Sequence, residues 1–195
     1  MRLVLATANP DKAREIAAIL TGIELVPRPP EVAEVEEDGA TLLDNARLKA
    51  RALVAATGHP AVADDTGLEV AALGGAPGPR AARWAGPHAS YADNVAKLLD
   101  ALSGEQNRRA CFRTVAVVAF PDGREVLGEG VVEGTITSAA RGTGGFGYDP
   151  VFRPDGGDGR TFAEMAPADK HALSHRGRAF RALAAALAGG GGQGP

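Results

Sequence analysis

Apolar side chains recur at helical spacing in the first half of the chain. In residues 10–20 and 42–57 they follow one another at intervals of three or four, which predicts two helices that each bury one face. Asn9 and Pro10 favour the start of the first helix, and the capping-box sequence TLLD, from Thr41, favours the start of the second. Both helices therefore have a defined beginning.

Short continuous apolar runs lie beside these helices. Residues 2–6 and 60–63 are too short for helices and predict buried strands. The second run leads directly to Asp64 and Asp65, and Thr66-Gly67 is expected to break the strand after them. Two adjacent carboxylates are thus predicted at the exit of a strand.

The spacing changes in the second half of the chain. A helix is predicted at 90–102, and two Val-rich runs at 110–120 and 124–137 then predict a hairpin. An Ala-rich helix at 175–188, capped by Ser174, ends the pattern.

Early alternation of helices and strands, followed by a late hairpin, indicates an α/β fold with a mixed sheet. We expect a single two-lobed domain over residues 1–188, in which helices flank a central mixed, strongly twisted β-sheet and the active cleft lies between the lobes. Residues 189–195 form a Gly-rich tail that is expected to be disordered.

Composition narrows the functional classes. The 24 acidic residues outnumber the 21 basic ones and the isoelectric point is near 5.8, so the strong positive field of nonspecific nucleic-acid binders is missing. The one cysteine, Cys111, permits no intramolecular disulfide, and its apolar segment favours a core position over a nucleophile. No apolar run approaches the roughly 18 residues that span a bilayer. We therefore expect a cytoplasmic protein with no nucleic-acid and no membrane partner.

Three cations lie where helices are predicted to begin, although the helix dipole disfavours them there. Lys12 is in the first turn of one helix, and His175 and Arg176 start another. Free amides at a helix start, together with a nearby cation, form a site for phosphate or carboxylate. The alternative is a solvated first turn. Only four lysines occur in the chain, and Lys49, beside an apolar helix face, and Lys170 are further candidates.

Asp64 and Asp65 are candidates for metal binding. Neighbouring strand residues point to opposite faces, so only one of the two is expected in a given cleft. A phosphate site favours Mg²⁺, which binds through one or two carboxylates plus phosphate oxygens. The acidic run Glu36-Glu37-Asp38 could supply the second carboxylate or form a solvated turn. The histidines show no zinc pattern, and no P-loop sequence is present.

The segment TGGFGYDPVF, residues 143–152, combines three glycines with three aromatic rings. Glycines let the backbone approach a flat ligand, and aromatic faces stack on nucleobases. Asp149 can accept a hydrogen bond from a base edge or a ribose hydroxyl. The alternative is a tight turn with Phe146 and Phe152 in the core. Beside a phosphate site, the segment predicts a nucleobase pocket.

Five sequence blocks follow one another between residues 7 and 177. They are Thr7-x-Asn9-x-x-Lys12-x-x-Glu15, Asp64-Asp65-Thr66-Gly67-Leu68, Gly75-Ala76-Pro77-Gly78 with Ala82-Arg83, Gly144-Gly145-Phe146-Gly147-Tyr148-Asp149-Pro150, and Ser174-His175-Arg176-Gly177. In this order they resemble the inosine/xanthosine triphosphate pyrophosphatases, also called dITP/XTP diphosphatases.

The resemblance implies a Mg²⁺-dependent, homodimeric enzyme. It would hydrolyse the deaminated purine nucleoside triphosphates ITP, dITP and XTP to the monophosphate and pyrophosphate, and so clean the nucleotide pool. It also implies that Asp65 is the proton acceptor and, with Glu37, a metal ligand. The implied substrate-binding residues are Thr7, Ala8, Asn9, Pro10, Asp11, Lys12, Lys49, Thr66, Phe146, Gly147, Tyr148, Asp149, Lys170, His175 and Arg176.

A mechanism follows as a hypothesis. The metal and the lysines neutralise the triphosphate, Asp65 orients or deprotonates a water, and the water attacks the α-phosphorus while pyrophosphate leaves. Donors facing O6 of hypoxanthine or xanthine would reject adenine, which carries an amino group there. The alternatives are a pyrimidine or modified-nucleotide pyrophosphatase of similar fold, and a non-catalytic nucleotide- or RNA-binding module.

Overall fold

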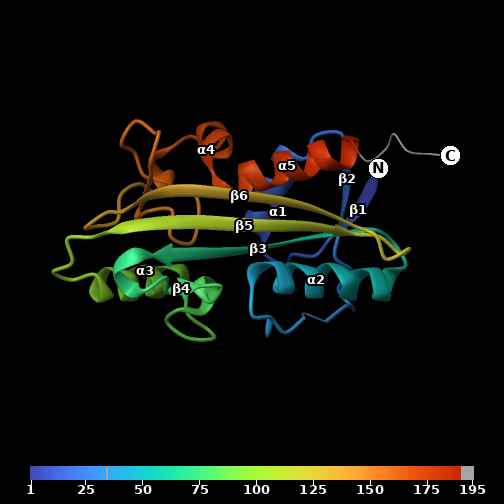
Figure 1. Cartoon of the computed structure of the whole chain (residues 1–195), viewed down its shortest axis with the longest axis horizontal. Coiled ribbons are helices and arrows are strands. Elements are labelled where there is room, and N and C mark those ends of the chain that lie inside the picture. The colour runs from blue at the N-terminus through green and yellow to red at the C-terminus, as the bar shows by residue number, and fades with distance from the viewer. Residues whose placement is uncertain (34, 190–195) are drawn as a thin grey trace. The chain divides into compact units, whose positions relative to one another are not determined.

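The computed structural model describes residues 1–33 and 35–189 and confirms a mixed α/β fold (Figure 1). Its seven-stranded sheet has the strand order β2-β1-β3-β5-β6-β7, and β4 pairs with β3 off this path. The strands are β1 (Arg2–Leu5), β2 (Glu24–Pro27), β3 (Ala61–Val70), β4 (Pro77–Gly78), β5 (Arg109–Ala119), β6 (Glu125–Ile136) and β7 (Phe152–Pro154). The helices are α1 (Pro10–Ile19), α2 (Leu42–Thr57), α3 (Tyr91–Ala101), α4 (Pro167–Leu173) and α5 (His175–Gly189), with short 3₁₀ turns at Ala71–Leu73, Ala81–Arg83 and Phe162–Glu164.

The sheet contains both strand directions. β1 is parallel to β2 and to β3, whereas β4 is antiparallel to β3, and β7 is antiparallel to β6. The helix starts at Asn9 and Thr41 are confirmed, since both side chains accept hydrogen bonds from backbone amides of the first helical turn.

The prediction that Thr66-Gly67 ends the third strand is wrong, because β3 continues to Val70. Leu68 and Val70 are fully buried, and Leu68 pairs with Gly78 of β4, so burial and pairing extend the strand beyond the glycine. The short strands β2, β4 and β7 were not predicted, because their few residues carry no clear alternation.

The chain forms two compact units. Unit 1 contains residues 1–65, 114–130 and 176–195, and unit 2 contains residues 66–113 and 131–175. The backbone passes from one unit to the other inside β3, β5 and β6 and again between His175 and Arg176. The expected single domain over residues 1–188 remains a prediction. Of the predicted tail, residues 190–195 lie outside the described part of the chain.

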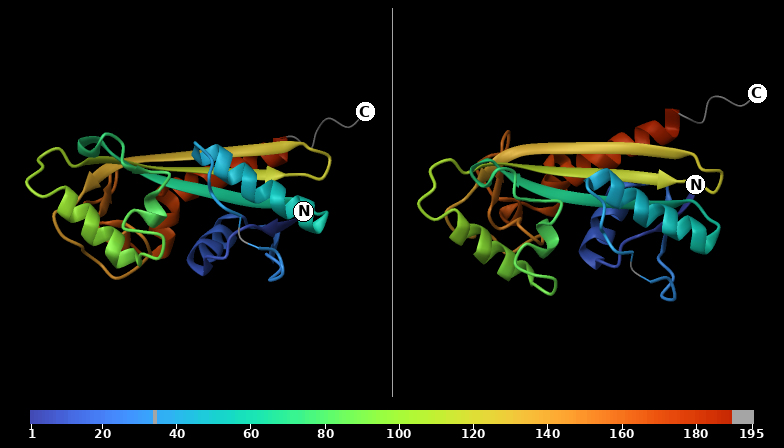
Figure 2. Two further views of the ribbon diagram at one scale, coloured as in Figure 1. Left: turned by 90° about the horizontal axis from the view of Figure 1, so that it is seen from below. Right: turned by 60° about the horizontal axis from the view of Figure 1, so that its bottom comes forward.

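In unit 1, helices cover both faces of the strands (Figures 1 and 2). α1 and α5 pack on one face, where Val62 of β3 and Val118 of β5 are buried. α2 packs on the other face, where the neighbouring residues Ala63 and Val117 are buried. This alternation of buried side chains along β3 also determines where the next two residues, Asp64 and Asp65, are held.

In unit 2, one apolar core joins α3 to the ends of the long strands. Leu98 of α3, Leu68 of β3 and Ile136 of β6 are fully buried in it. Phe112 and Phe152 belong to the same core, with ring centroids 4.6 Å apart. This core supports the glycine-rich segment 143–152.

Cys111 is buried, and burial raises the pKa of its thiol to about 11. The cysteine is therefore a core residue, as predicted, because a thiol that stays protonated is a poor nucleophile. None of the helices described in residues 1–33 and 35–189 is long and apolar enough to cross a membrane.

Candidate active site

Unit 1 holds a cluster of charged side chains that we call the cation–carboxylate cluster. Its members are Lys12, Glu15, Glu37, Lys49, Asp64, Asp65 and Arg176. They come from α1, α2, β3, α5 and the segment before α2, so the fold brings together residues that are far apart in sequence.

Asp64 and Asp65 are each only 4% exposed, and their carboxylates contact different cations. The Asp64 carboxylate is 3.5 Å from Lys12 Nζ and 3.3 Å from Arg176 Nε. The Asp65 carboxylate accepts from Lys49 Nζ at 3.2 Å and from Asn45 Nδ2 at 3.1 Å. The two carboxylates have different nearest partners, but cations of one cluster bind both of them, and the expectation that only one of the two faces a given cleft remains a prediction.

Arg176 is 2% exposed and is held by two carboxylates. Its Nη1 donates to Glu15 at 2.6 Å, and its Nε and Nη2 each donate to Asp64 at 3.3 Å. Arg176 is the second residue of α5, so the two acids compensate a cation that the helix dipole disfavours.

Lys49 bridges the two residues that the resemblance implies as metal ligands. Its Nζ lies 2.7 Å from Glu37 Oε1 and 3.2 Å from Asp65 Oδ1. A cation is therefore already stabilised between these carboxylates, and oxygen ligands are those that Mg²⁺ prefers. In residues 1–33 and 35–189, no group of three or more His, Cys, Asp or Glu side chains could hold a metal ion. Glu37 and Asp65 thus offer two carboxylates to a metal ion, and any further ligands would have to come from outside these side chains.

The two adjacent aspartates have opposite pKa shifts. Burial acts to raise the pKa of Asp64, but attraction by Lys12, Arg176 and Lys49 outweighs it and lowers that pKa below its ordinary value. Burial also raises the pKa of Asp65, and repulsion by Glu37 adds to this, while Lys49 only partly opposes it. Asp65 is consequently the better proton acceptor of the pair.

The start of α1 is already capped by a side chain. Asn9 Oδ1 accepts from the backbone amides of Asp11 at 2.9 Å and Lys12 at 3.3 Å. Thr7 Oγ1 in turn accepts from the Asn9 amide at 3.1 Å. Anion binding at these helix-start amides would compete with the Asn9 cap. Ala8 and Pro10 are exposed beside them.

Unit 2 holds the second group of predicted site residues. The Phe146 amide donates to Asp149 Oδ2 at 2.8 Å, and Lys170 Nζ lies 2.5 Å from the same oxygen. The Lys170 ammonium is also 4.8 Å from the Phe146 ring centroid. A side chain at Gly145, whose φ is +66°, would overlap the Asp149 carboxylate. The glycine is needed so that this loop can close around Asp149.

Two further predicted contacts are core residues in this structure. Tyr148 is buried and donates its hydroxyl to the Ala81 carbonyl at 2.9 Å. The His175 ring is buried and stacks on Phe112, with centroids 4.3 Å apart. The remaining predicted positions, Thr66 and Gly147, are half-buried.

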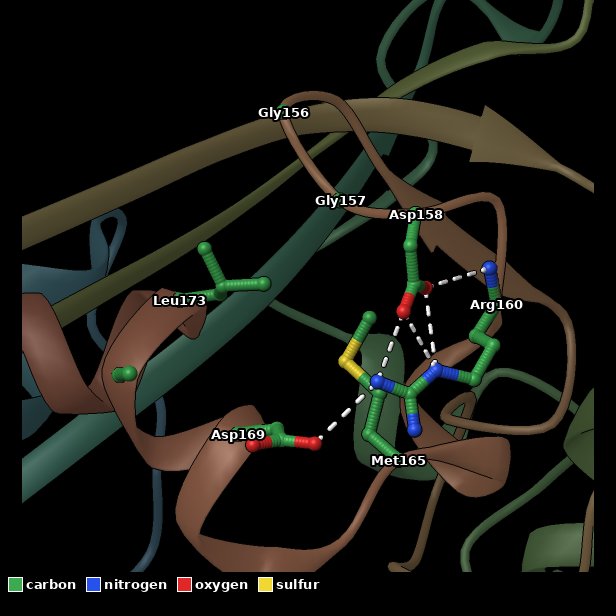
Figure 3. A pocket seen from close by; sticks show the side chains of 8 residues that line it. Gly156, Gly157, Asp158, Arg160, Met165, Asp169 and Leu173 are labelled. Atoms are coloured by element: carbon green, nitrogen blue, oxygen red, sulfur yellow. Dashed lines mark hydrogen bonds and ion pairs between the residues drawn. The ribbon is translucent and has the colours of Figure 1, made fainter.

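A hollow of about 290 Å³ lies elsewhere in unit 2 and includes none of the predicted site residues (Figure 3). Its charged lining residues are Asp158, Arg160 and Asp169, and Arg160 pairs with Asp158 at 2.8 Å and with Asp169 at 3.2 Å. Because the guanidinium and the two carboxylates satisfy one another, this hollow does not compete with the cation–carboxylate cluster as a phosphate site.

Comparison with known proteins decides the family. The sequence model of the Ham1 family matches residues 3–186. The chain belongs to the Ham1 family. This Ham1 member is 47% identical to a protein of Streptomyces coelicolor named dITP/XTP pyrophosphatase, with 93% of this chain and 94% of that protein covered.

Solved structures agree with this assignment. A HAM1 protein from Coxiella burnetii matches with a TM-score of 0.88 and 38% identity, covering 97% of this chain and 99% of that one. A nucleoside-triphosphatase, or dITP/XTP pyrophosphatase, from Mycobacterium abscessus matches with a TM-score of 0.75 and 46% identity, covering 94% and 98%.

The sequence analysis did not single out Asn45, and it named Glu15 only as part of the first sequence block, without a role in the site. Asn45 orients Asp65, and Glu15 holds Arg176. A signal existed for both, because Asn45 lies four residues before Lys49 and Glu15 lies three residues after Lys12, so each shares a helix face with a predicted site residue.

Proposed function

We propose that this protein hydrolyses the deaminated purine nucleoside triphosphates ITP, dITP and XTP to the monophosphate and pyrophosphate, with Mg²⁺ as cofactor. The names of relatives at 46% and 47% identity support the reaction. In a cell, this reaction removes non-standard nucleotides before polymerases can use them.

The charge of the cation–carboxylate cluster is the observation that carries the proposal. Three cations, Lys12, Lys49 and Arg176, face four carboxylates, so the cluster has a net charge of −1. A strongly negative triphosphate cannot bind there favourably unless a further cation accompanies it. A nucleotide that arrives with Mg²⁺ satisfies this requirement, and the metal supplies positive charge at the phosphate oxygens.

In the proposed reaction, Glu37 and Asp65 would hold the metal, and Lys12 and Lys49 bind phosphate oxygens. Asp65 accepts a proton from the attacking water. The water oxygen forms a bond to the α-phosphorus, and the bond from that phosphorus to the bridging oxygen of the β-phosphate breaks. Pyrophosphate takes the electron pair and leaves.

We assign recognition of the base to unit 2. The Phe146 ring offers a stacking surface, and the Lys170 ammonium and the Phe146 amide are donors at the adjacent Asp149 carboxylate. A donor facing O6 of hypoxanthine or xanthine would lose its partner when adenine binds. We further propose a homodimer located in the cytoplasm, for which sedimentation of the purified protein is the test of assembly.

The test is pyrophosphate release from ITP, ATP and GTP with and without Mg²⁺, by the wild type and by Asp65→Asn. We expect Mg²⁺-dependent turnover of ITP in preference to ATP and GTP, and a loss of about 10²–10⁴-fold in kcat for the variant, because a general base contributes this much. IMP binding should persist in the variant.

The matched control is Asp122→Asn, which removes the same charge from an exposed pair with Arg124. Undiminished turnover by Asp65→Asn would contradict the mechanism. Faster turnover of dUTP or of a methylated UTP than of ITP would instead identify a pyrimidine or modified-nucleotide pyrophosphatase.

A further inference from the structure

Tyr91 is an exposed aromatic residue at a fixed point of unit 2. It is the first residue of α3 and its side chain is 43% exposed, whereas the core-facing side chains of this helix, such as Leu98, are buried. The helix start is held by a reciprocal cap in which Ser90 Oγ accepts from the Asp93 amide and Asp93 accepts from the Ser90 amide. The position of Tyr91 is therefore set by the cap and does not depend on burial of its own ring.

The Tyr91 ring lies beside Phe146. Their centroids are 5.8 Å apart and the two rings are tilted by 40°. Phe146 is itself held in place, because its amide donates to Asp149 and the Lys170 ammonium lies over its ring. Two rings, from α3 and from the glycine-rich segment, thus form one aromatic surface with an exposed end.

We infer that Tyr91 is a nucleobase-binding residue, and that the Tyr91–Phe146 pair together forms the surface on which the base packs. This inference rests on the proposed function. A purine has two fused rings and offers more area than a single phenyl ring covers, so a second ring adjacent to Phe146 adds apolar contact that a pyrimidine would use less. Tyr91 is 43% exposed in the free protein, and apolar ring area that a ligand covers is removed from water, which is favourable.

The experiment compares Tyr91→Ala, Tyr91→Phe and the control Leu127→Ala, whose side chain has the same 43% exposure but lies on β6 in unit 1. Steady-state kinetics with ITP give KM and kcat for each. Inhibition by inorganic tripolyphosphate, which has phosphates and no base, gives a Ki that reports on the phosphate site alone. Calorimetric titration with IMP measures base binding without turnover.

For Tyr91→Ala we expect a KM for ITP and a Kd for IMP about tenfold above wild type, at the lower end of what stacking contributes, with kcat changed less than twofold. The Ki of tripolyphosphate should not change. Tyr91→Phe keeps the ring and should bind ITP and IMP as the wild type does. Leu127→Ala should match the wild type in KM, kcat, Ki and Kd.

An unchanged Kd for IMP in Tyr91→Ala would overturn the inference, and so would a Ki for tripolyphosphate that rises in the same proportion as the KM. Failure of the proposed function gives a different result: the wild type would then bind IMP more tightly than Tyr91→Ala while releasing no pyrophosphate from ITP. Equal melting temperatures for the variants and the wild type exclude unfolding as the cause.

Discussion

Asp64 and Asp65 are neighbours on one strand, yet each carboxylate has a different set of partners. The sequence predicted the acidic pair and its division between two faces of the strand. It could not predict that Asp64 would bind Lys12 and Arg176, because these cations come from helices at opposite ends of the chain. Long-range packing of α1 and α5 against the strands decides that pairing.

Asp64→Asn should destabilise the protein at neutral pH. The substitution removes the carboxylate beside Lys12 and one of the two carboxylates that hold Arg176, and breaking a buried ion pair typically costs about 3–5 kcal/mol. Urea unfolding of the variant and the wild type at pH 7 measures the difference. The matched control variant is Asp122→Asn, whose carboxylate belongs to an exposed ion pair. Its free energy of unfolding should differ from that of the wild type by less than about 0.5 kcal/mol.

The pH dependence of this difference has a definite sign. Because the pKa of Asp64 is lowered in the folded protein from an ordinary value of 3.8, its stabilising contribution is present above that pH and is lost as the pH falls below it. The gap between the wild type and Asp64→Asn should therefore be largest near neutral pH and narrow in acid. A gap that widens in acid would show that Asp64 is not held by its charge.

At the level of elements, local signals in the sequence located the helices well. α2 runs from Leu42 to Thr57 as predicted, because the Thr41 capping box and the glycine after Thr57 define both ends. Gly128 shows what local signals leave out. A glycine inside a strand predicts a bulge from the sequence alone, but in the structure a Cβ at Gly128 would meet the backbone of α5 at Leu183 N, 2.5 Å away.

Gly128→Ala should therefore destabilise unit 1 by about 1–3 kcal/mol, since an added methyl group forces α5 away from β6. Thermal unfolding followed by circular dichroism measures the loss. The control is Gly189→Ala, where a Cβ meets nothing within 4 Å. If both variants unfold at the same temperature, α5 does not pack on β6 as closely as described.

For the whole molecule, the sequence predicted the α/β class and two lobes, whereas the residues that make up each compact unit depend on contacts that the sequence does not contain. The predicted site residues are divided accordingly. Unit 1 contains the cation–carboxylate cluster and unit 2 contains Phe146, Asp149 and Lys170. Periodicity fixes which side chains are buried in an element, but it contains no information on which elements pack together.

The whole molecule should also be stable without metal. Glu37 and Asp65 are bridged by Lys49, and no larger group of ligand side chains lies in the part of the chain that the structure describes. Millimolar Mg²⁺ or a chelator should therefore leave the melting temperature of the free protein unchanged, while the chelator abolishes turnover of ITP. Mg²⁺ together with IMP should raise the melting temperature, because a ligand that binds only the folded state stabilises it. A large rise in the melting temperature with Mg²⁺ alone would indicate a preformed metal site.

The four crossings of the backbone between the units restrict how this protein can change in evolution or be engineered. The first lies between Asp65 and Thr66, and the last between His175 and Arg176. Since neither unit is a single stretch of sequence, a single crossover cannot exchange one whole unit for its counterpart from another protein. Substitution at a single exposed position, such as Tyr91, needs no such exchange and leaves both units intact.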